Sequence, residues 1–402
     1  MGKLHWKRGP PSPRKWPYTK PNLTNLTYQR RNFLKSLSLG ALVPGTMVNT
    51  LAEYVNTISI DAGSSSYPSS DIEELYQRSI VFDGLLIPRG WDGDSFDALA
   101  KSGYTGFNAS LPSRSFESAM MAMKEWSQRI NDNSDKLLHA TTVADLERAK
   151  REGKTGIIYG FQNSTMIERS IDNIDQLYSA GTRWIQLTYN ERNLVGDGCT
   201  ERTNVGLSDF GIEVVNRMNE LGIIVDLSHC GDQTTMEGIQ FSKTGATINH
   251  SMCEALYPNH PRAKSDEQIR AMAEKGGVMG IICLGYMIGP DPGGETTLET
   301  YVDHIDHAVK VAGIDQVGLA SDFPIQGLKA NGATRENWYV PRLTRFKPSY
   351  QVKWPPWIPE LEEPQRYLSV ARVLDKRGYS TGDIEKILGG NWMRYFKEVF
   401  GS

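Results

Sequence analysis

The sequence predicts an α/β protein built on a (β/α)8 barrel, and three observations lead to that fold class. Short apolar runs rich in β-branched residues alternate with amphipathic stretches from Asp71 onward. Eight such runs occur, and eight βα units over about 250 to 300 residues are typical of this barrel. No glycine-rich phosphate loop follows the first run, where residues 83–87 read DGLLI, so a doubly wound open sheet is the weaker alternative.

The elements can be placed in order along the chain from their periodicity. Ser208 stands ahead of an apolar stripe and predicts a helix N-cap, and Gly222 predicts the turn that ends the same helix. Strands are expected at 79–82, 105–109, 156–161, 183–187, 223–227, 246–248, 277–283 and 317–320. Helices are expected at 115–130, 143–151, 171–180, 208–221, 234–242, 266–275, 298–311, 364–376 and 381–400.

Residues 1–60 differ from the rest and predict an export leader, followed by the barrel domain over residues 61–402. Arg30 and Arg31 precede a Phe-Leu-Lys triplet and a short, weakly apolar run over 36–48. This order resembles a bacterial twin-arginine signal, which makes the twin-arginine export machinery an expected partner and a periplasmic or exported location the expected one. A basic disordered tail is the alternative. The run is too short and too broken by Gly and Pro to span a bilayer stably.

Bulk properties narrow the function. The formal net charge of -3 is nearly balanced, so nothing indicates a nucleic-acid partner. The four cysteines form no CxxC pair, so neither a disulfide framework nor a thiolate zinc site is indicated. Residues 323–364, after the eighth strand, form a long aromatic insertion, and a loop of this length typically acts as a lid or a subunit contact.

Polar residues follow several predicted strands, and in a barrel those strand ends share one mouth. His229 and His250 each come just past an apolar run, and Asp322 follows the eighth strand. Two imidazoles and a carboxylate are a metal-binding set, and zinc would lower the pKa of a bound water. Asp322 would then take the water's proton and return it to a leaving amine. Asp226 is expected to anchor a loop or a neighbouring histidine.

Several motifs in order resemble the membrane (renal-type) dipeptidase family, peptidase family M19. They include GIIVDLSH at 222–229, INHS at 248–251, HPR at 260–262 and VGLASDF at 317–323, and the resemblance covers roughly residues 72–401. It implies a barrel of the metallo-dependent hydrolase type that binds two zinc ions and cleaves dipeptides. By position, His229 and His250 match ligands of the second zinc. Arg262 matches the arginine that engages the substrate carboxylate, and Asp322 matches the acidic residue that assists proton transfer.

The chain differs from this family at the positions that bind the first zinc ion. Leu85 and Ile87 stand where the family has a histidine and an aspartate, Gln162 replaces the bridging glutamate, and Tyr189 replaces a substrate-contacting histidine. Leucine and isoleucine offer no lone pair, and an amide cannot offset two divalent cations. We therefore expect one zinc ion, held by the two histidines and a third group. The candidates for that group are Gln162, Asp322, Glu201 and Cys199.

The predicted function is a dipeptidase-like metallohydrolase that cleaves the amide bond of a dipeptide or another small peptide-derived substrate. Arg262, Tyr189 and Gln162 are expected to contact that substrate, and the loop carrying Cys199 and Glu201 either dips into the mouth or is an ordinary connection. Two alternatives stay open: a metal-free enzyme that modifies a peptide-derived metabolite, and a non-catalytic binding protein. The resemblance, together with the aromatic insertion, also suggests a homodimer.

Overall fold

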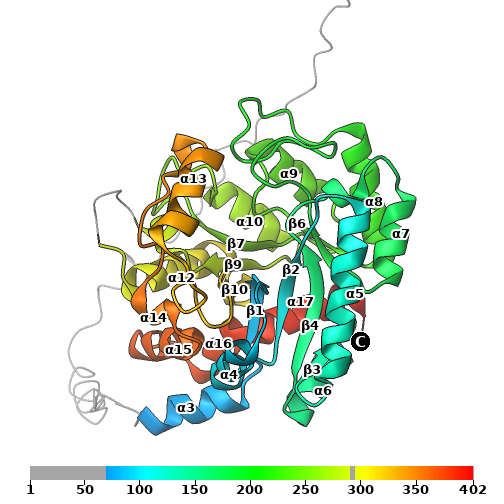
Figure 1. Ribbon diagram of the computed structural model, residues 1–402. Helices are drawn as coiled ribbons and strands as arrows, with labels where there is room; N and C mark the ends of the chain where they lie inside the picture. The colour runs from blue at the N-terminus through cyan, green and yellow to red at the C-terminus, as the bar shows by residue number, and fades with distance from the viewer. Residues whose placement is uncertain (1–68, 290–294, 402) are drawn as a thin grey trace, which may run out of the picture. The chain divides into compact units, whose positions relative to one another are not determined.

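The structure is a computed structural model that describes residues 69–289 and 295–401, and the predicted leader over residues 1–60 lies outside these ranges. The barrel prediction is confirmed, because eight parallel strands form its wall (Figure 1). These strands are β1 (Phe82–Leu86), β2 (Gly106–Leu111), β4 (Thr155–Phe161), β5 (Thr182–Gln186), β6 (Ile224–Asp226), β7 (Ile248–Cys253), β9 (Met279–Ile282) and β10 (Val317–Ala320).

Two parallel sheets make up the wall, and backbone hydrogen bonds join them at both seams. One sheet has the order β1-β2-β4-β5-β6, and the other runs β10-β9-β7. At the first seam, Thr247 N donates to Val225 O at 2.9 Å and Leu227 N donates to Thr247 O at 2.9 Å. At the second, Asp322 N donates to Leu85 O at 2.9 Å. Two short strands, β3 (Leu137–His139) and β8 (Ala263–Lys264), extend the wall at β4 and β7.

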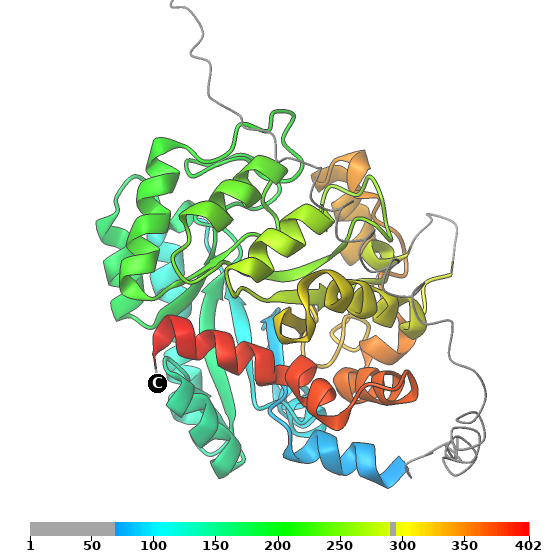
Figure 2. The ribbon, with the colours of Figure 1, turned by 180° about the vertical axis from the view of Figure 1, so that it is seen from behind.

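Helices pack around the outside of the barrel (Figures 1 and 2). Ser208 Oγ accepts a hydrogen bond from Gly211 N at 2.9 Å, and Gly222 ends the same helix with a φ of 73°, so both predicted ends are confirmed. The helices between the strands are α4 (Gly93–Ser102), α5 (Phe116–Asp132), α6 (Val143–Glu152), α7 (Asp172–Ser179), α8 (Asp209–Leu221), α9 (Asp232–Phe241), α10 (Asp266–Glu274), α11 (Gly285–Ile288) and α12 (Leu298–Ala312).

The C-terminal helix α17 (Asn391–Phe400) closes the barrel where the strands begin, and it lies across the barrel wall in Figure 2. Trp392 packs in an aromatic cluster with Phe82, Trp184 and Phe396, all of which are buried. A Cβ at Gly318 would lie 2.5 Å from the Trp392 ring, so only glycine admits the indole there. With this end filled, the open mouth is at the carboxyl ends of the strands.

The remaining α-helices precede β1 or follow β10, and five single helical turns are spread along the described residues. They are α3 (Ser69–Arg78), α13 (Val340–Arg345), α14 (Pro359–Glu362), α15 (Arg366–Lys376) and α16 (Thr381–Glu385), with single turns η1 (Thr165–Ile167), η2 (Ile314–Gln316), η3 (Arg335–Tyr339), η4 (Pro348–Tyr350) and η5 (Lys386–Gly390). The helix predicted over 381–400 is thus divided at Gly389, whose backbone is not helical. Among the described residues, none of the helices combines the length and apolarity needed to cross a bilayer.

Two strands lie elsewhere than predicted. The first was expected at 79–82 and occupies Phe82–Leu86, because Asp83 and Gly84 continue the strand instead of turning. The sixth was expected to end at residue 248, and β7 continues to Cys253. His250 therefore lies inside a strand and not just past one. The edge strand β3 was not predicted, since its three residues are too few to show a period.

Candidate functional site

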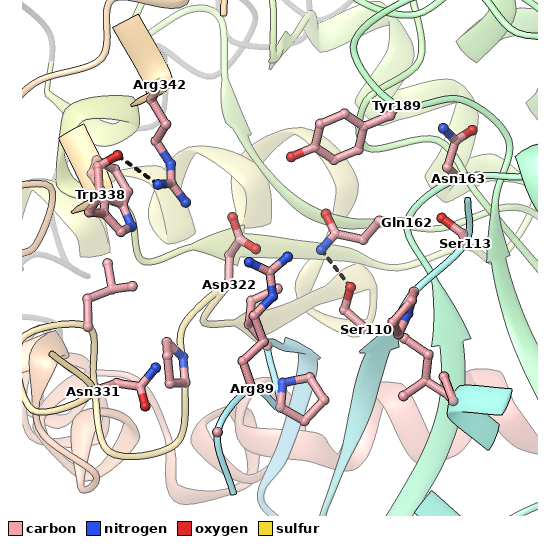
Figure 3. A pocket seen from close by; sticks show the side chains of 18 of the residues that line it. Arg89, Ser110, Ser113, Gln162, Asn163, Tyr189, Asp322, Asn331, Trp338 and Arg342 are labelled. Carbon is pink, nitrogen blue, oxygen red and sulfur yellow. Dashed lines mark hydrogen bonds between the residues drawn. The ribbon is translucent and has the colours of Figure 1, made fainter. Parts of the chain in front are cut away.

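A cavity of about 1190 Å³ opens at the carboxyl ends of the barrel strands. Four of the predicted site residues line it, namely Gln162, Tyr189, His229 and Asp322. The aromatic insertion forms one wall and contributes Trp338, Phe346 and Tyr350 among others. Figure 3 shows Asp322 near the centre of the cavity, with Gln162 and Tyr189 on one side and Arg342 on the other.

Asp322 follows β10 in an unusual backbone conformation, with a φ of 55°. This left-handed geometry is uncommon outside glycine and is found disproportionately at functional sites. Within the described ranges, no side chain donates a hydrogen bond to its carboxylate or forms an ion pair with it. Burial raises the pKa of Asp322 to about 6, although Arg262 and Arg342 act in the opposite direction. A carboxyl group with a pKa near neutrality is suited to accept and return a proton.

His229 and His250 are brought together as predicted, and both are buried. Their Nε2 atoms are 2.9 Å apart. The Nδ1 atom of His229 contacts Asn190 Oδ1 at 2.7 Å, and the Nδ1 atom of His250 contacts Asn249 Oδ1. Burial, with further contributions from Arg262, lowers the pKa of both rings well below the usual value for histidine. Both rings are therefore neutral at physiological pH.

A buried polar network fixes the backbone that carries these histidines. The carboxylate of Asp226 accepts from Ser228 N at 3.0 Å and from Asn249 N at 2.7 Å. Ser228 Oγ donates to Asn249 Oδ1 at 2.9 Å and accepts from His250 N at 3.1 Å. The anchoring role expected of Asp226 is thus confirmed, and both histidine-bearing segments are tied to one carboxylate.

Tyr189 and Gln162 lie on the cavity wall, where the sequence placed them. The Tyr189 ring stacks on His229 with centroids 4.2 Å apart. Gln162 Nε2 donates to Ser110 Oγ at 2.8 Å, and Gln186 Nε2 donates to Gln162 O at 2.5 Å. These contacts hold both side chains in place at the cavity. Their contact with a substrate stays a prediction.

Arg262 lies behind the histidine pair and is not among the described residues that line the cavity. It is 1% exposed, and its guanidinium donates to Ser228 O at 2.9 Å, to Tyr350 Oη at 3.0 Å and to His250 O at 2.5 Å. All three nitrogens are therefore committed to the protein. This arrangement supports the histidine-bearing backbone, and contact of Arg262 with a substrate carboxylate stays a prediction.

Cys199 and Glu201 lie beside the site rather than in it. Cys199 N donates to His229 O at 2.8 Å, and burial raises the pKa of its thiol to about 11, so the thiolate is disfavoured. The Glu201 carboxylate accepts from the backbone N–H groups of Arg192 and Arg202 and so stabilises its own loop. Neither residue lines the cavity in the described part of the chain.

The donor set does not fit a zinc ion. Within residues 69–289 and 295–401, no group of three or more His, Cys, Asp and Glu side chains is placed to hold a metal. The histidine pair supplies two neutral nitrogens, whereas protein zinc sites use three or four ligands. Arg262 and Lys264 lie close enough to lower the pKa of both histidines. The same positive potential opposes a divalent cation.

Sequence reasoning missed the arginines of the mouth. Arg89, Arg114, Arg129, Arg342 and Arg345 all line the cavity. They come from loops, from α5 and from α13, so no strand-end pattern could identify them. The one local signal was the pair Arg342 and Arg345 at helical spacing within the aromatic insertion.

Comparisons with known proteins agree on one family. The sequence model described as Membrane dipeptidase (Peptidase family M19) matches residues 94–341. Dipeptidase tcpJ of Claviceps purpurea is 28% identical over 268 residues, which are 66% of this chain. The match covers 56% of that relative, so the chain spans just over half of its length.

Solved structures show the same fold. An amidohydrolase from Pseudomonas aeruginosa superposes with a TM-score of 0.74 and 31% identity, over 82% of this chain and 99% of that one. A metallopeptidase from Rhodobacter sphaeroides, solved with a phosphinate mimic of the dipeptide L-Ala-D-Ala, superposes with a TM-score of 0.65 and 17% identity. This second alignment covers 80% of this chain and 99% of that one, and at such identity it supports the fold alone.

Proposed function

This chain belongs to the membrane dipeptidase family, peptidase family M19, and on that premise we propose that it hydrolyses the amide bond of a small peptide-derived substrate with Asp322 as the acid–base group. One observation carries the proposal. The Asp322 carboxyl group lies in the cavity, has no hydrogen-bonding partner among the described side chains and has a pKa raised to about 6. Such a group takes up and releases protons at the pH where a cell operates.

The chemistry follows from the groups around Asp322. The ionised carboxylate takes a proton from a water molecule as the water oxygen attacks the amide carbonyl carbon. The guanidinium group of Arg342 points toward Asp322 in Figure 3 and stabilises the oxyanion that forms. Protonated Asp322 then gives the proton to the leaving nitrogen, and the C–N bond breaks. One water is consumed, and a carboxylic acid and an amine are released.

The family consists of metallopeptidases that typically use zinc, but no step of this mechanism passes through a metal. The reason is the donor set, since two neutral imidazoles beside Arg262 and Lys264 complete neither the ligand number nor the charge balance of a zinc site. His229 instead forms part of one wall of the cavity, and His250 lies behind it. His229 presents its ring through the stack with Tyr189.

A hydrolase with one zinc ion is the second candidate, and a specific observation favours it. The Nδ1 atoms of His229 and His250 both contact asparagine side chains, which is how a second shell orients metal-binding imidazoles. This candidate requires a third protein ligand. Gln162 and Asp322 line the same cavity as His229, whereas Glu201 and Cys199 do not.

Export to the periplasm and assembly into a homodimer are further proposals. The support for export is the order Arg30, Arg31, Phe33, Leu34 and Lys35 ahead of a short apolar run. The support for a dimer is family membership and the length of the aromatic insertion. Fractionation of cells that make the tagged chain, and light scattering of the purified protein, test the two.

The catalytic proposal is tested with the purified full chain, metal analysis and release of free amine from L-Ala-D-Ala and from N-acetylated tetrapeptides. We expect hydrolysis with well under one zinc per chain, unaffected by a chelator. Asp322→Asn should lower the rate by about a hundredfold or more. Asp135→Asn, at an exposed aspartate paired with Lys136, is the matched control and should keep the rate.

Two results would decide against the metal-free mechanism. Activity that depends on about one zinc per chain and disappears in His229→Ala would establish the second candidate. A folded protein that releases no amine from any of these peptides, with or without added zinc, would overturn the hydrolase proposal itself. Thermal unfolding of each variant shows that the fold is intact.

A further inference from the structure

The charge of the cavity is strongly one-sided. Five arginines line it, and its only lining carboxylates among the described residues are Glu125 and Asp322. None of the five arginines forms an ion pair within the described part of the chain, although surface arginines elsewhere do, as Arg372 does with Glu73 at 2.6 Å. Unpaired guanidinium groups that converge on one cavity are the usual means of binding carboxylates and phosphates. The five arginines are Arg89, Arg114, Arg129, Arg342 and Arg345.

Aromatic rings hold two of these guanidinium groups without neutralising them. Arg342 lies over the Trp338 ring at 3.8 Å, and its Nη1 donates to Trp338 O at 2.8 Å. Arg129 lies over the Trp126 ring at 4.5 Å. A guanidinium stacked on an aromatic face keeps its N–H edges available for a planar anion. These arginines are therefore positioned in advance, and their charge is left for a ligand.

The arginines stand at two sides of the mouth. Arg342 and Arg345 belong to α13, whereas Arg129 belongs to α5 and Arg114 precedes it. Figures 1 and 2 agree that α13 and α5 lie on opposite sides of the barrel. Arg89, from the loop after β1, points toward Asp322 in Figure 3. A ligand that satisfies both sides must carry separate anionic groups across the reacting position.

A free dipeptide suits this cavity poorly. It is smaller than the drug-sized ligands that fill sites of about 300–1,000 Å³, and the cavity here measures about 1190 Å³. A free dipeptide also carries an ammonium group, which the five arginines repel. Of the two lining carboxylates, Asp322 could offset that ammonium only by giving up its role as proton acceptor, and Glu125 lies on α5 beside Arg129.

We propose that the cavity binds an acidic peptide-derived molecule that is longer than a dipeptide, has a blocked amino terminus and carries anionic groups on both sides of the bond presented to Asp322. The inference rests on the proposed function in one respect, since it names the substrate class of the same cavity. Arg345 and Arg89 hold one anionic end, Arg114 and Arg129 hold the other, and Arg342 stays at the reacting bond. Stacking on Trp126 and Trp338 adds contact area for the chain between.

Calorimetric titration of the full chain tests the proposal without requiring turnover. The probes are N-acetyl-Glu-Ala-Ala-Glu, its uncharged counterpart N-acetyl-Gln-Ala-Ala-Gln amide, and the dipeptide Ala-Ala. We expect the acidic peptide to bind at least about tenfold more tightly than either other probe, and to lose affinity as salt is raised from about 50 to about 300 mM. The Asp322→Asn variant should retain this preference, so a failure of catalysis does not remove the binding result.

Arginine variants test which side of the cavity binds each anionic end of the peptide. Arg89→Gln and Arg129→Gln should each weaken binding of the acidic peptide by about five- to tenfold while the uncharged peptide is unaffected. Arg372→Gln, on the outer helix α15, is the matched control and should change nothing. Equal affinity for the acidic and uncharged peptides, or binding that does not respond to salt, would overturn the proposal whatever the variants do. An effect of Arg89→Gln without any effect of Arg129→Gln would overturn the two-sided arrangement.

Discussion

His229 and His250 face each other through Nε2 atoms 2.9 Å apart, a distance that requires a hydrogen on one of the two nitrogens when both rings are neutral. The hydrogen bonds around Asn249 determine which nitrogen carries this hydrogen. Asn249 Nδ2 donates to Gly84 O at 3.1 Å and Ser228 Oγ donates to Asn249 Oδ1, so the orientation of this amide is fixed. His250 Nδ1–H must then donate to Asn249 Oδ1, and His250 Nε2 accepts from His229 Nε2–H.

We therefore predict different tautomers for the two histidines: Nδ1–H for His250 and Nε2–H for His229. Asn190 Oδ1 lies 2.7 Å from His229 Nδ1, so this tautomer also requires the Asn190 side-chain amide to turn over and present its NH2 group to that nitrogen. A metal bound between the rings would instead require a bare Nε2 on both. Long-range ¹H–¹⁵N spectra of the protein with labelled histidine distinguish the two states.

His304 provides an internal reference for those spectra. Its Nδ1 accepts from Cys253 N at 3.0 Å, which leaves Nε2–H to donate to Ile288 O at 2.9 Å. Its signals mark the Nε2–H tautomer in the same sample. Signals for His229 that match the Nδ1–H form would contradict the prediction and favour a metal between the rings.

The barrel could be predicted from the sequence because strand and helix patterns alternate repeatedly along the chain. Ser208 and Gly222 mark their helix ends through local hydrogen bonding and backbone conformation, and both stand as predicted. The predicted first strand ended at residue 82 and so excluded Asp83 and Gly84, which continue it. Gly84 is inside a strand, where a Cβ would lie 2.8 Å from the Trp392 ring. That requirement comes from a residue about three hundred positions away and has no local signature.

The site was predictable only in part, for a related reason. His229 and Asp322 follow strands, and strand ends converge in any barrel. Arg262 has the right residue type at the right motif position, but its guanidinium bond to Tyr350 depends on how the insertion folds back, and its bonds to Ser228 O and His250 O depend on the barrel fold. Arg89 and Arg342 reach the mouth from a loop and from the insertion, which no periodicity describes.

The rate of hydrolysis should depend on the ionisation of Asp322. Burial raises its pKa to about 6, and the base must be ionised, so kcat/KM should rise with pH through about 6 and level off above. Arg342 lowers this pKa, so Arg342→Gln should move the rising limb to higher pH. A pH profile measured with an uncharged substrate separates this shift from weaker binding. A limb that stays in place in Arg342→Gln would contradict the electrostatic coupling.

Ionised Asp322 should also lower the free energy of unfolding at neutral pH. Its pKa is raised from 3.8 to about 6 on folding, so the folded state holds this proton more tightly than the unfolded state. The penalty is absent below the unfolded pKa, grows as pH rises from about 4 to about 6, and is constant above. Asp322→Asn should therefore raise the free energy of unfolding at pH 8 by about 1 to 3 kcal/mol and by much less at pH 4. Denaturant titrations at the two pH values measure the difference, and an equal effect at both would contradict it.

Variants of Arg262 and Arg89 should have different effects: the first should lower stability, and the second should weaken substrate binding. Arg262→Met removes the donors to Ser228 O, His250 O and Tyr350 Oη, and leaves buried acceptors unpaired. It should lower the free energy of unfolding by about 2 to 4 kcal/mol. Arg89→Gln alters an exposed side chain that bonds to no other described residue, so its effect on unfolding should stay within about 0.5 kcal/mol. Denaturant unfolding and KM measured on both variants test the contrast. A stable Arg262→Met protein with a raised KM would instead show that Arg262 leaves its buried position to hold the substrate.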